Sequence, residues 1–240
     1  MKALLVSSLL QAGVCLAHYT FSEVILNGKA MGGDYEYIRA HTNSINPQPS
    51  DRGAFNSTDL RCNKGSRADG KTKTLTVTAG DQIGFKLQFG FLIDHPGPSF
   101  VYLSKAPESG VATYDGSGDW FKVFESGLCT PQGRPIDPQT GWCIYNSDRV
   151  NYTIPATLPP GEYLARVENL AIHYAFLGQV QVYAECAQIK VVNTTGTGKP
   201  GPMVKIPGLY SNSDPGLSYD VNAYPVAPPY IMPGPAVWTG

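Results

Sequence analysis

The sequence predicts an all-β protein, an antiparallel sandwich with long loops and little helix. Three observations point to this class. Several short segments are rich in β-branched and aromatic residues, some of them alternate apolar with polar side chains, and glycine, proline, asparagine or aspartate occupies the gaps between them. The run from Thr74 to Ala79 has the clearest period of two, which is the spacing of side chains on one face of a strand.

Eight strands are expected along the chain. In order they cover residues 19–26, 72–79, 82–89, 99–104, 120–125, 150–154, 162–168 and 178–192. Many short strands separated by turn residues are typical of an immunoglobulin/fibronectin-III-like β-sandwich. The stretches 27–70, 106–119 and 125–149 are longer than ordinary connections, and long loops on a rigid sandwich usually form the binding surface.

The first 17 residues have the pattern of a removable signal peptide. Lys2 supplies the positive charge, residues 3–14 the apolar run, and Cys15-Leu16-Ala17 the small-residue cleavage site. Residues 18–240 are then expected to form one domain, with 196–240 as an extended segment packed on the core because it holds too many apolar groups for a solvated linker. No second membrane-spanning run or lipid-anchor tail follows, so a secreted, extracellular, monomeric protein is expected.

Charge and composition narrow the class of partner. The formal net charge is −1, and charged residues make up only 15% of the chain, so the sequence predicts no binding to nucleic acid or to an anionic membrane. Glycine, proline and tyrosine are plentiful. This composition suits a loop-rich β-protein whose partner is neutral and polar, such as a carbohydrate.

The cysteines agree with export. One leaves with the signal peptide, and the remaining four are Cys62, Cys129, Cys143 and Cys186. An even number in an oxidising compartment predicts two disulfides, with three possible connectivities that spacing cannot separate. A four-cysteine zinc site is disfavoured because its short ligand spacing is absent. Candidate glycosylation sites are Asn56, Asn151 and Asn193.

His18 would become the amino terminus after cleavage. A terminal histidine offers its α-amine and its ring Nδ1, which can close on one metal ion as a chelate. A second ligand could come from His95, which lies in a proline- and glycine-rich turn just before the strand at 99–104, where loops and termini meet. The ordinary alternative is a turn histidine whose ring is hydrogen-bonded locally.

The alternating segment from Gln179 to Tyr183 allows two interpretations. Gln181 and Tyr183 share one strand face, and the two valines between and before them share the other. The usual arrangement in a sandwich would place the valines on the core and the glutamine and tyrosine in solvent. Alternatively, the phenol could be an axial neighbour of a metal and the amide a hydrogen-bond donor to a bound oxygen species. Alternation alone leaves both open.

Together these motifs carry a resemblance that covers the whole mature chain. They include His18-Tyr19-Thr20-Phe21, His95-Pro96-Gly97-Pro98, Pro160-Gly161-Glu162-Tyr163-Leu164, Ala171-Ile172-His173, Gln181-Val182-Tyr183, Ile206-Pro207-Gly208-Leu209-Tyr210 and Pro235-Ala236-Val237-Trp238. In this order they resemble the fungal copper-dependent lytic polysaccharide monooxygenases of auxiliary activity family nine, the cellulose-active group. Each motif is weak alone, but their order and joint presence are highly specific.

The resemblance implies a copper site with two histidines. The α-amine and Nδ1 of His18 and Nε2 of His95 would bind one copper ion, with Tyr183 as the axial ligand. His173 and Gln181 would act on the oxygen co-substrate without binding the metal. Because the segment between these two is about one residue shorter than is usual in the family, Gln179, on the same strand face, is a possible substitute for Gln181.

The resemblance also implies disulfides and a substrate contact. The family's disulfide between the sheets would pair Cys62 with Cys186, which leaves Cys129 with Cys143. Tyr210 occupies the position of a surface aromatic that stacks on sugar, although it could equally hold the C-terminal segment to the sandwich. Tyr35 and Tyr37 are weaker candidates, and His41 is expected to have no role.

The implied activity is oxidative cleavage of β-1,4-glucan chains in cellulose, with oxidation at C1 favoured over C4. Such an enzyme uses O2 or H2O2 and an external electron donor. The alternative is a non-catalytic copper-binding or carbohydrate-binding sandwich that keeps the two histidines. A glycoside hydrolase is disfavoured, because no carboxylates form a recognisable acid–base pair.

Overall fold

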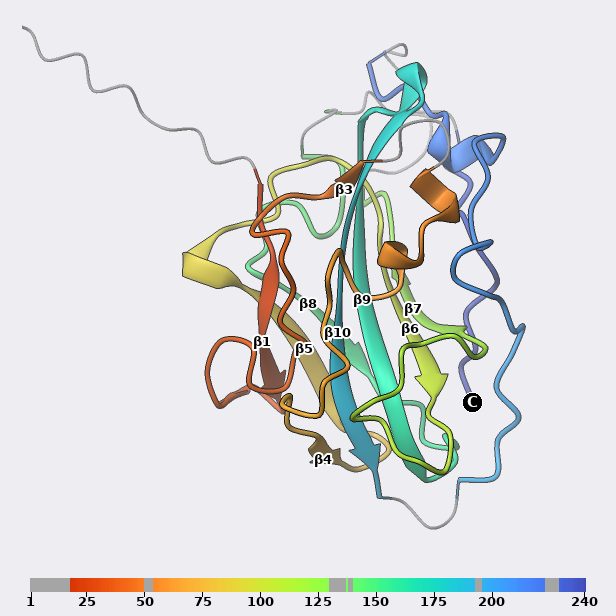
Figure 1. Ribbon diagram of the computed structural model, residues 1–240. Coiled ribbons are helices and arrows are strands. Elements are labelled where there is room, and N and C mark those ends of the chain that lie inside the picture. The colour runs from red at the N-terminus through yellow and green to blue at the C-terminus, as the bar shows by residue number, and fades with distance from the viewer. Residues whose placement is uncertain (1–17, 50–53, 130–136, 138–139, 193–195, 223–228) are drawn as a thin grey trace, which may run out of the picture.

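Two stacked β-sheets form the body of the molecule, with long loops at both ends (Figure 1). The computed structural model describes residues 18–49, 54–129, 137, 140–192, 196–222 and 229–240. The strands are β1 (Phe21–Leu26), β2 (Lys29–Met31), β3 (Gln48–Pro49), β4 (Leu75–Val77), β5 (Gln82–Leu87), β6 (Ser99–Lys105), β7 (Phe121–Ser126), β8 (Arg149–Thr153), β9 (Gly161–Tyr174) and β10 (Gln179–Val191). Helix in these residues is limited to five 3₁₀ turns: η1 (Ala54–Asn56), η2 (Thr58–Leu60), η3 (Gln88–Gly90), η4 (Ala175–Leu177) and η5 (Pro215–Leu217). No helix among them could span a bilayer.

The smaller sheet has the order β2-β1-β5-β8, and the larger has β3-β10-β9-β6-β7 with β4 alongside β10. All pairings are antiparallel except β4 with β10. The predicted all-β sandwich and its eight expected strands are therefore confirmed. The sequence missed the short strands β2 and β3, and it ended β9 six residues early, at Glu168 instead of Tyr174.

The larger sheet is buried on both faces. One face packs against the smaller sheet, where Phe21, Phe85 and Tyr183 belong to the core between the sheets. The opposite face holds a second apolar cluster that includes Val180 and Val182. The usual expectation for this segment was therefore wrong, because the valines face the outer cluster and Tyr183 faces the core between the sheets.

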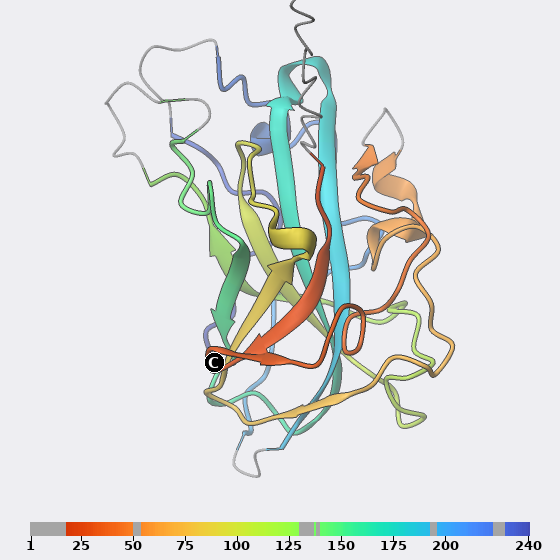
Figure 2. The ribbon, with the colours of Figure 1, turned by 90° about the vertical axis from the view of Figure 1, so that its left-hand side faces the viewer.

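The C-terminal segment covers that outer face of the larger sheet (Figures 1 and 2). Ile206, Tyr210 and Leu217 are buried in the second cluster. Near the chain end the segment reaches the edge of the core between the sheets instead, where the Trp238 ring meets Phe121 edge-on at a centroid separation of 5.5 Å and the Trp238 amide donates to the Lys122 carbonyl. Both faces of the central strands are therefore dry, and residues 163–172 of β9 are all buried, charged and polar ones included.

Two disulfides tie loops to this frame. Cys62 joins the loop after η2 to Cys186 in β10, and Cys129 joins Cys143, so the pairing implied by the resemblance is present. The candidate glycosylation sites Asn56 and Asn151 are both exposed. Asn193 lies outside the described residues.

Candidate metal centre

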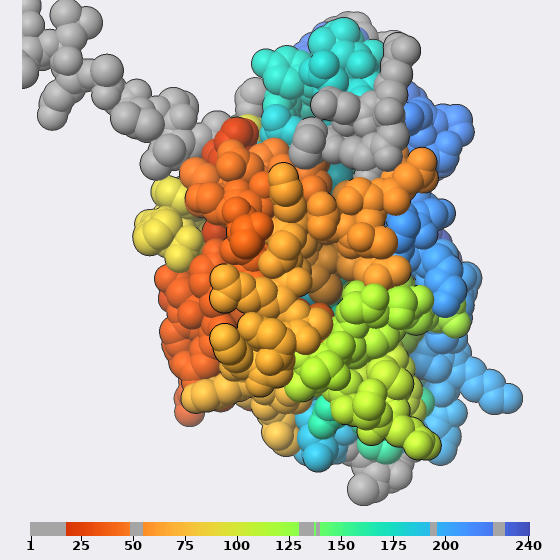
Figure 3. Space-filling model, in the orientation of Figure 1, coloured from red at the N-terminus to blue at the C-terminus, as the bar shows by residue number. Residues whose placement is uncertain are grey.

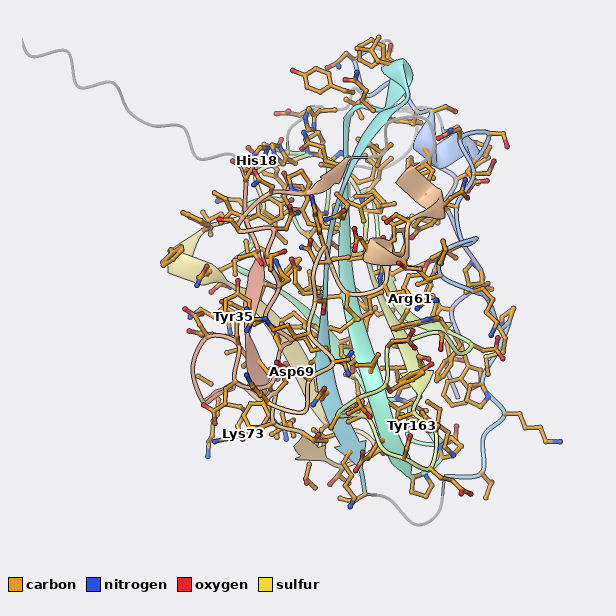
Figure 4. All side chains as sticks on the ribbon, in the orientation of Figure 1. His18, Tyr35, Arg61, Asp69, Lys73 and Tyr163 are labelled. Atoms are coloured by element: carbon orange, nitrogen blue, oxygen red, sulfur yellow. A yellow bond between two sulfur atoms is a disulfide. The ribbon has the colours of Figure 1, made fainter. Side chains whose placement is uncertain are left out.

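Three predicted ligands converge at one end of the sandwich. His18 lies directly before β1, at the upper left of Figure 4. Its ring centroid is 6.4 Å from that of His95 and 6.3 Å from that of Tyr183, and the last two are 5.8 Å apart. His18 and His95 are partly exposed, whereas Tyr183 is fully buried beneath them. The phenol therefore forms the floor of a site that opens to the surface.

The position of His95 is set by a glycine two residues later. The Ile172 amide donates to the Pro96 carbonyl and the Leu170 amide to the Pro98 carbonyl, so the turn lies directly on β9. Gly97 between them has φ +146°, and a Cβ there would stand 1.7 Å from the Leu170 carbonyl oxygen. Only glycine permits this approach. The turn is therefore anchored on the same strand that carries His173.

His173 stacks against His95. The two ring centroids are 4.6 Å apart with an interplanar angle of 23°. Burial, and then the neighbouring His95, lower the pKa of His173 to about 4, so the ring is neutral at pH 7. Its Nδ1 is buried and has no hydrogen-bond partner among the described residues. A neutral imidazole with an unused nitrogen therefore lies beside the proposed ligands.

Gln181 is the glutamine that reaches this site. Its Oε1 accepts a hydrogen bond from the Tyr183 hydroxyl at 3.1 Å, which leaves the side-chain NH2 group as the end that can donate. Gln179 pairs with Tyr174 at the strand end and is exposed, and a register shift separates it from Gln181. Gln181, and not Gln179, is therefore the glutamine that contacts Tyr183.

The donor set fits a metal ion bound by two histidines. Metal–imidazole bonds are about 2.0–2.1 Å long. Adding about 1.1 Å from nitrogen to ring centre puts two opposed imidazoles about 6.3 Å apart, close to the 6.4 Å between His18 and His95. Nitrogen ligands in a tetragonal arrangement suit copper. No group of three or more histidine, cysteine, aspartate or glutamate side chains is placed to hold a metal within the described ranges. The third nitrogen predicted from the sequence is the His18 α-amine, which cleavage after Ala17 would create.

The buried ring of Tyr19, which the sequence analysis did not single out, packs against Tyr183. The Tyr19 ring stacks on the Tyr183 ring at 4.1 Å and 22°, and its hydroxyl donates to Asn169 Oδ1. Asn169 Nδ2 in turn donates to the Pro98 carbonyl at 3.1 Å. The polar Asn169, which directly precedes the apolar residues 170–172 of β9, was the available sign of this contact.

A second buried polar cluster lies beneath Thr20. Glu185 accepts hydrogen bonds from Thr20 Oγ1 and Asn63 Nδ2, and burial raises its pKa to about 7. His41 Nε2 is 3.7 Å from its Oε1 and 3.1 Å from Thr20 Oγ1. His41 is therefore part of this cluster, and that it has no functional role stays a prediction.

The predicted sugar contact at Tyr210 is wrong. Its side chain is only 8% exposed, and its hydroxyl donates to the buried carboxylate of Glu168. Glu168 also pairs with Arg166 at 2.6 Å. Tyr210 thus holds the C-terminal segment on β9, and its ring offers no open face to a substrate. Tyr35 and Tyr37 are half-buried against the core.

We expect Tyr210→Phe to destabilise the fold and to leave binding to cellulose, the substrate that the resemblance implies, unchanged. It removes one hydrogen bond to a buried charged group, which costs about 1.5–3 kcal/mol, or a Tm lower by about 3–12 °C in a protein of this size. Thermal unfolding and a cellulose pull-down measure the two effects. The control is Tyr35→Phe, whose hydroxyl is 3.5 Å from Thr20 Oγ1, and it should change Tm less. Lost cellulose binding at unchanged Tm would restore Tyr210 as a substrate contact.

Comparison with known families agrees with this geometry. Residues 18–230 match the model of Auxiliary Activity family 9, formerly GH61. The chain belongs to this family. The family 9 match begins at His18, the residue that the sequence predicts as the mature terminus. Its members named below are lytic polysaccharide monooxygenases, the copper-dependent oxidoreductases that cleave polysaccharides oxidatively, and the family 9 chain described here belongs to that class.

Several relatives are similar over most of the chain. Lytic polysaccharide monooxygenase G of Aspergillus tamarii is 45% identical over 224 residues, which are 93% of this chain and 66% of that protein. Monooxygenase A of Aspergillus fumigatus is 41% identical over 248 residues, covering all of this chain and 83% of its own length. The chain thus spans about two thirds of the A. tamarii protein.

Solved family 9 structures share the fold. The crystal structure of HiLPMO9B is 29% identical, with a TM-score of 0.78 over 93% of this chain and all of that one. A cellulose-active polysaccharide monooxygenase from M. thermophila is 30% identical, with a TM-score of 0.77 and the same coverage.

Proposed function

We propose that the chain, after cleavage behind Ala17, is a secreted copper monooxygenase that cuts β-1,4-glucan chains of cellulose by oxidation, with C1 favoured over C4. One observation carries the proposal: His18, His95 and His173 converge with the buried ring of Tyr183 from four separate segments. The family match that starts at His18 supports the cleavage site. A neutral polar substrate agrees with the low charge content of the chain.

The copper ion would be held by three nitrogens, from the His18 α-amine, the His18 ring and the His95 ring, with the Tyr183 phenol beneath them. When reduced by an external donor, bound copper supplies the redox chemistry that activates O2 or H2O2 for C–H oxidation. Tyr19 fixes the phenol by stacking on it. The dry floor of the site keeps the phenol protonated, because burial raises the pKa of Tyr183 well above its usual range.

His173 and Gln181 would act beside the metal. A neutral imidazole has one donor and one acceptor nitrogen, and its stack on His95 fixes where they point. His173 can therefore hold or pass one proton at the edge of the site. The Gln181 NH2 group can donate a hydrogen bond, because Tyr183 already occupies its Oε1.

Product analysis tests this proposal. Copper-loaded protein that begins at His18, given ascorbate with O2 or H2O2, is expected to release C1-oxidised oligosaccharides from microcrystalline cellulose, measured by mass spectrometry. Parallel reactions on xyloglucan define the substrate range. His95→Ala is the control and should bind copper weakly and release no oxidised product. Wild-type protein that binds one copper but oxidises no polysaccharide would favour the non-catalytic alternative.

A further inference from the structure

Arg39 is a buried arginine without a counter-ion. It is 2% exposed, and no carboxylate among the residues that the structure describes forms an ion pair with it. Its Nε donates to Gln188 Oε1 at 2.9 Å and its Nη2 to the Val111 carbonyl at 2.7 Å. A guanidinium has five N–H donors, so two on Nη1 and one on Nη2 remain unused within the described part of the chain. A buried charge is costly unless it is paired.

The guanidinium keeps its charge at neutral pH. Burial lowers the pKa of Arg39 to about 10, so the group is still protonated at pH 7. Asp115 and Asp69 act against this effect of burial, but Asp115 pairs with Arg61 at 2.9 Å and Asp69 with Lys71 at 3.9 Å. Arg39 therefore has the charge and the free donors to bind an anion that the described residues do not supply.

Arg39 lines a cavity of about 210 Å³. The walls come from two loops, one running from Thr58 to Ala68 and the other contributing Asp115. The Ser66 hydroxyl in the first loop is buried and has no hydrogen-bond partner among the described residues. Buried polar groups are normally hydrogen-bonded, so the unpaired hydroxyl and the unused guanidinium donors indicate a polar occupant.

The cavity is separate from the metal centre. Figure 4 shows Arg61, which lines the cavity, well below His18, and none of the proposed metal ligands lines it. In Figure 3 the orange residues 54–70 and the yellow-green residues 106–119 lie against each other on the face turned to the viewer. A ligand would therefore enter from the side of the sandwich and not at the end that holds His18.

We propose that this cavity binds a small hydroxylated monocarboxylate, the chemistry of a sugar acid. A carboxylate matches the unused donors of Arg39, because a guanidinium holds two carboxylate oxygens through parallel N–H···O bonds. The carboxylates of Asp59 and Asp115 also line the cavity, and they would repel a dianion such as sulfate more strongly than a monoanion. Asp59 and Ser66 can accept hydrogen bonds from hydroxyl groups of the ligand.

The volume limits the ligand to a small molecule. Pockets for drug-sized ligands measure about 300–1,000 Å³, so the 210 Å³ here suits a single sugar unit. Aldonates, which are sugars oxidised at C1, and uronates, which are oxidised at C6, both carry one carboxylate and several hydroxyls. The inference goes beyond the proposed function, because binding in this cavity requires neither the metal centre nor cellulose.

Calorimetric titration of the copper-loaded protein with sodium gluconate, sodium glucuronate and glucose tests the inference. We expect at least one of the two acids to bind with a Kd of about 1 mM or below. Glucose lacks the charge and should bind about tenfold more weakly or worse. Tighter binding of gluconate identifies an aldonate site, and tighter binding of glucuronate a uronate site. Because hydroxy acids also bind copper, His95→Ala should be titrated in parallel and should bind the acid as the parent does.

Two variants test the cavity itself. Ser66→Asp adds a carboxylate to the wall and loses no hydrogen bond, so it should abolish acid binding at an unchanged Tm. Arg39→Lys keeps the charge without the planar fork and should weaken binding about tenfold. Arg67→Gln is the matched control, because Arg67 lies on the same loop but is exposed and does not line the cavity. Its binding should equal that of the parent.

Several results would overturn the inference. They are a parent that binds neither acid, equal binding of glucose and the acids, displacement of the acid by an equal concentration of sulfate, and parent-like binding by Ser66→Asp. Loss of acid binding in His95→Ala would place the ligand at the metal centre instead. A protein that binds the acid in this cavity but oxidises no polysaccharide would contradict the proposed function and leave this site in place.

Discussion

A protein that retains Ala17 is expected to bind copper about a thousandfold more weakly than one that begins at His18, and to release no oxidised sugar. The extra residue converts the His18 amine into an amide, whose nitrogen lone pair is delocalised into the carbonyl. One of three nitrogen ligands is lost, and about 4 kcal/mol of binding energy corresponds to this factor. Copper titration calorimetry and product analysis measure the two effects.

The folded structure should not be disturbed by this change. His18 lies at the surface and β1 begins only at Phe21, so both forms should unfold at the same temperature. The control is a protein that begins at His18 and carries Val192→Ser, at an exposed position after β10, and it should bind copper as the parent does. Equal copper affinity with and without Ala17 would contradict the assignment of the α-amine as a ligand.

Replacing Gly97 by alanine is expected to lower the free energy of unfolding by about 4 kcal/mol, near the upper end for single substitutions. The new Cβ would collide with the Leu170 carbonyl oxygen, a backbone atom that cannot rotate away. At this chain length the change corresponds to a Tm lower by about 8–16 °C. The turn must move off β9, so His95 shifts relative to His173 and copper binding should weaken as well.

Denaturant unfolding and copper titration of Gly97→Ala test both effects. Gly33→Ala serves as the matched control, because a Cβ there meets nothing within 4 Å and the residue does not have a positive φ. It should leave stability and copper affinity near the parent values. Parent-like stability of Gly97→Ala would show that the turn can relax without cost, and parent-like copper affinity would show that His95 does not depend on it.

Strand positions were predictable because they depend on local pattern. The alternation from Thr74 to Ala79 and the β-branched runs that became β5, β6 and β10 have the side-chain chemistry of strands. The short strands β2 and β3 could not be recognised, since three and two residues hold too little pattern. β9 continues to Tyr174 because it remains paired with β10 as far as Gln179, whereas the sequence interpretation ended it at the charged Glu168.

The residue types of the proposed metal ligands could also be recognised from local sequence, but the strand faces on which they lie could not. A terminal histidine, a second histidine in a glycine-dependent turn and a tyrosine in a strand are visible in the sequence, and their motifs identify the family. The sequence does not show which face of β10 packs against which core. The larger sheet is covered on both sides, so an alternation of side chains cannot mark one of its faces as the solvent-exposed one.

Tertiary packing therefore determined whether each aromatic residue is buried or exposed. Tyr183 faces the core between the sheets, and Tyr210 is buried against Glu168 under the C-terminal segment, although both tyrosines look equally amphipathic in the sequence. Phe89, which the pattern assigns to a strand, is left in water. The sequence by itself determined most of the strands and the set of proposed metal-binding groups. Only the folded structure decided which aromatic rings are buried and which are exposed, because exposure depends on segments distant in the chain that cover or leave open each surface.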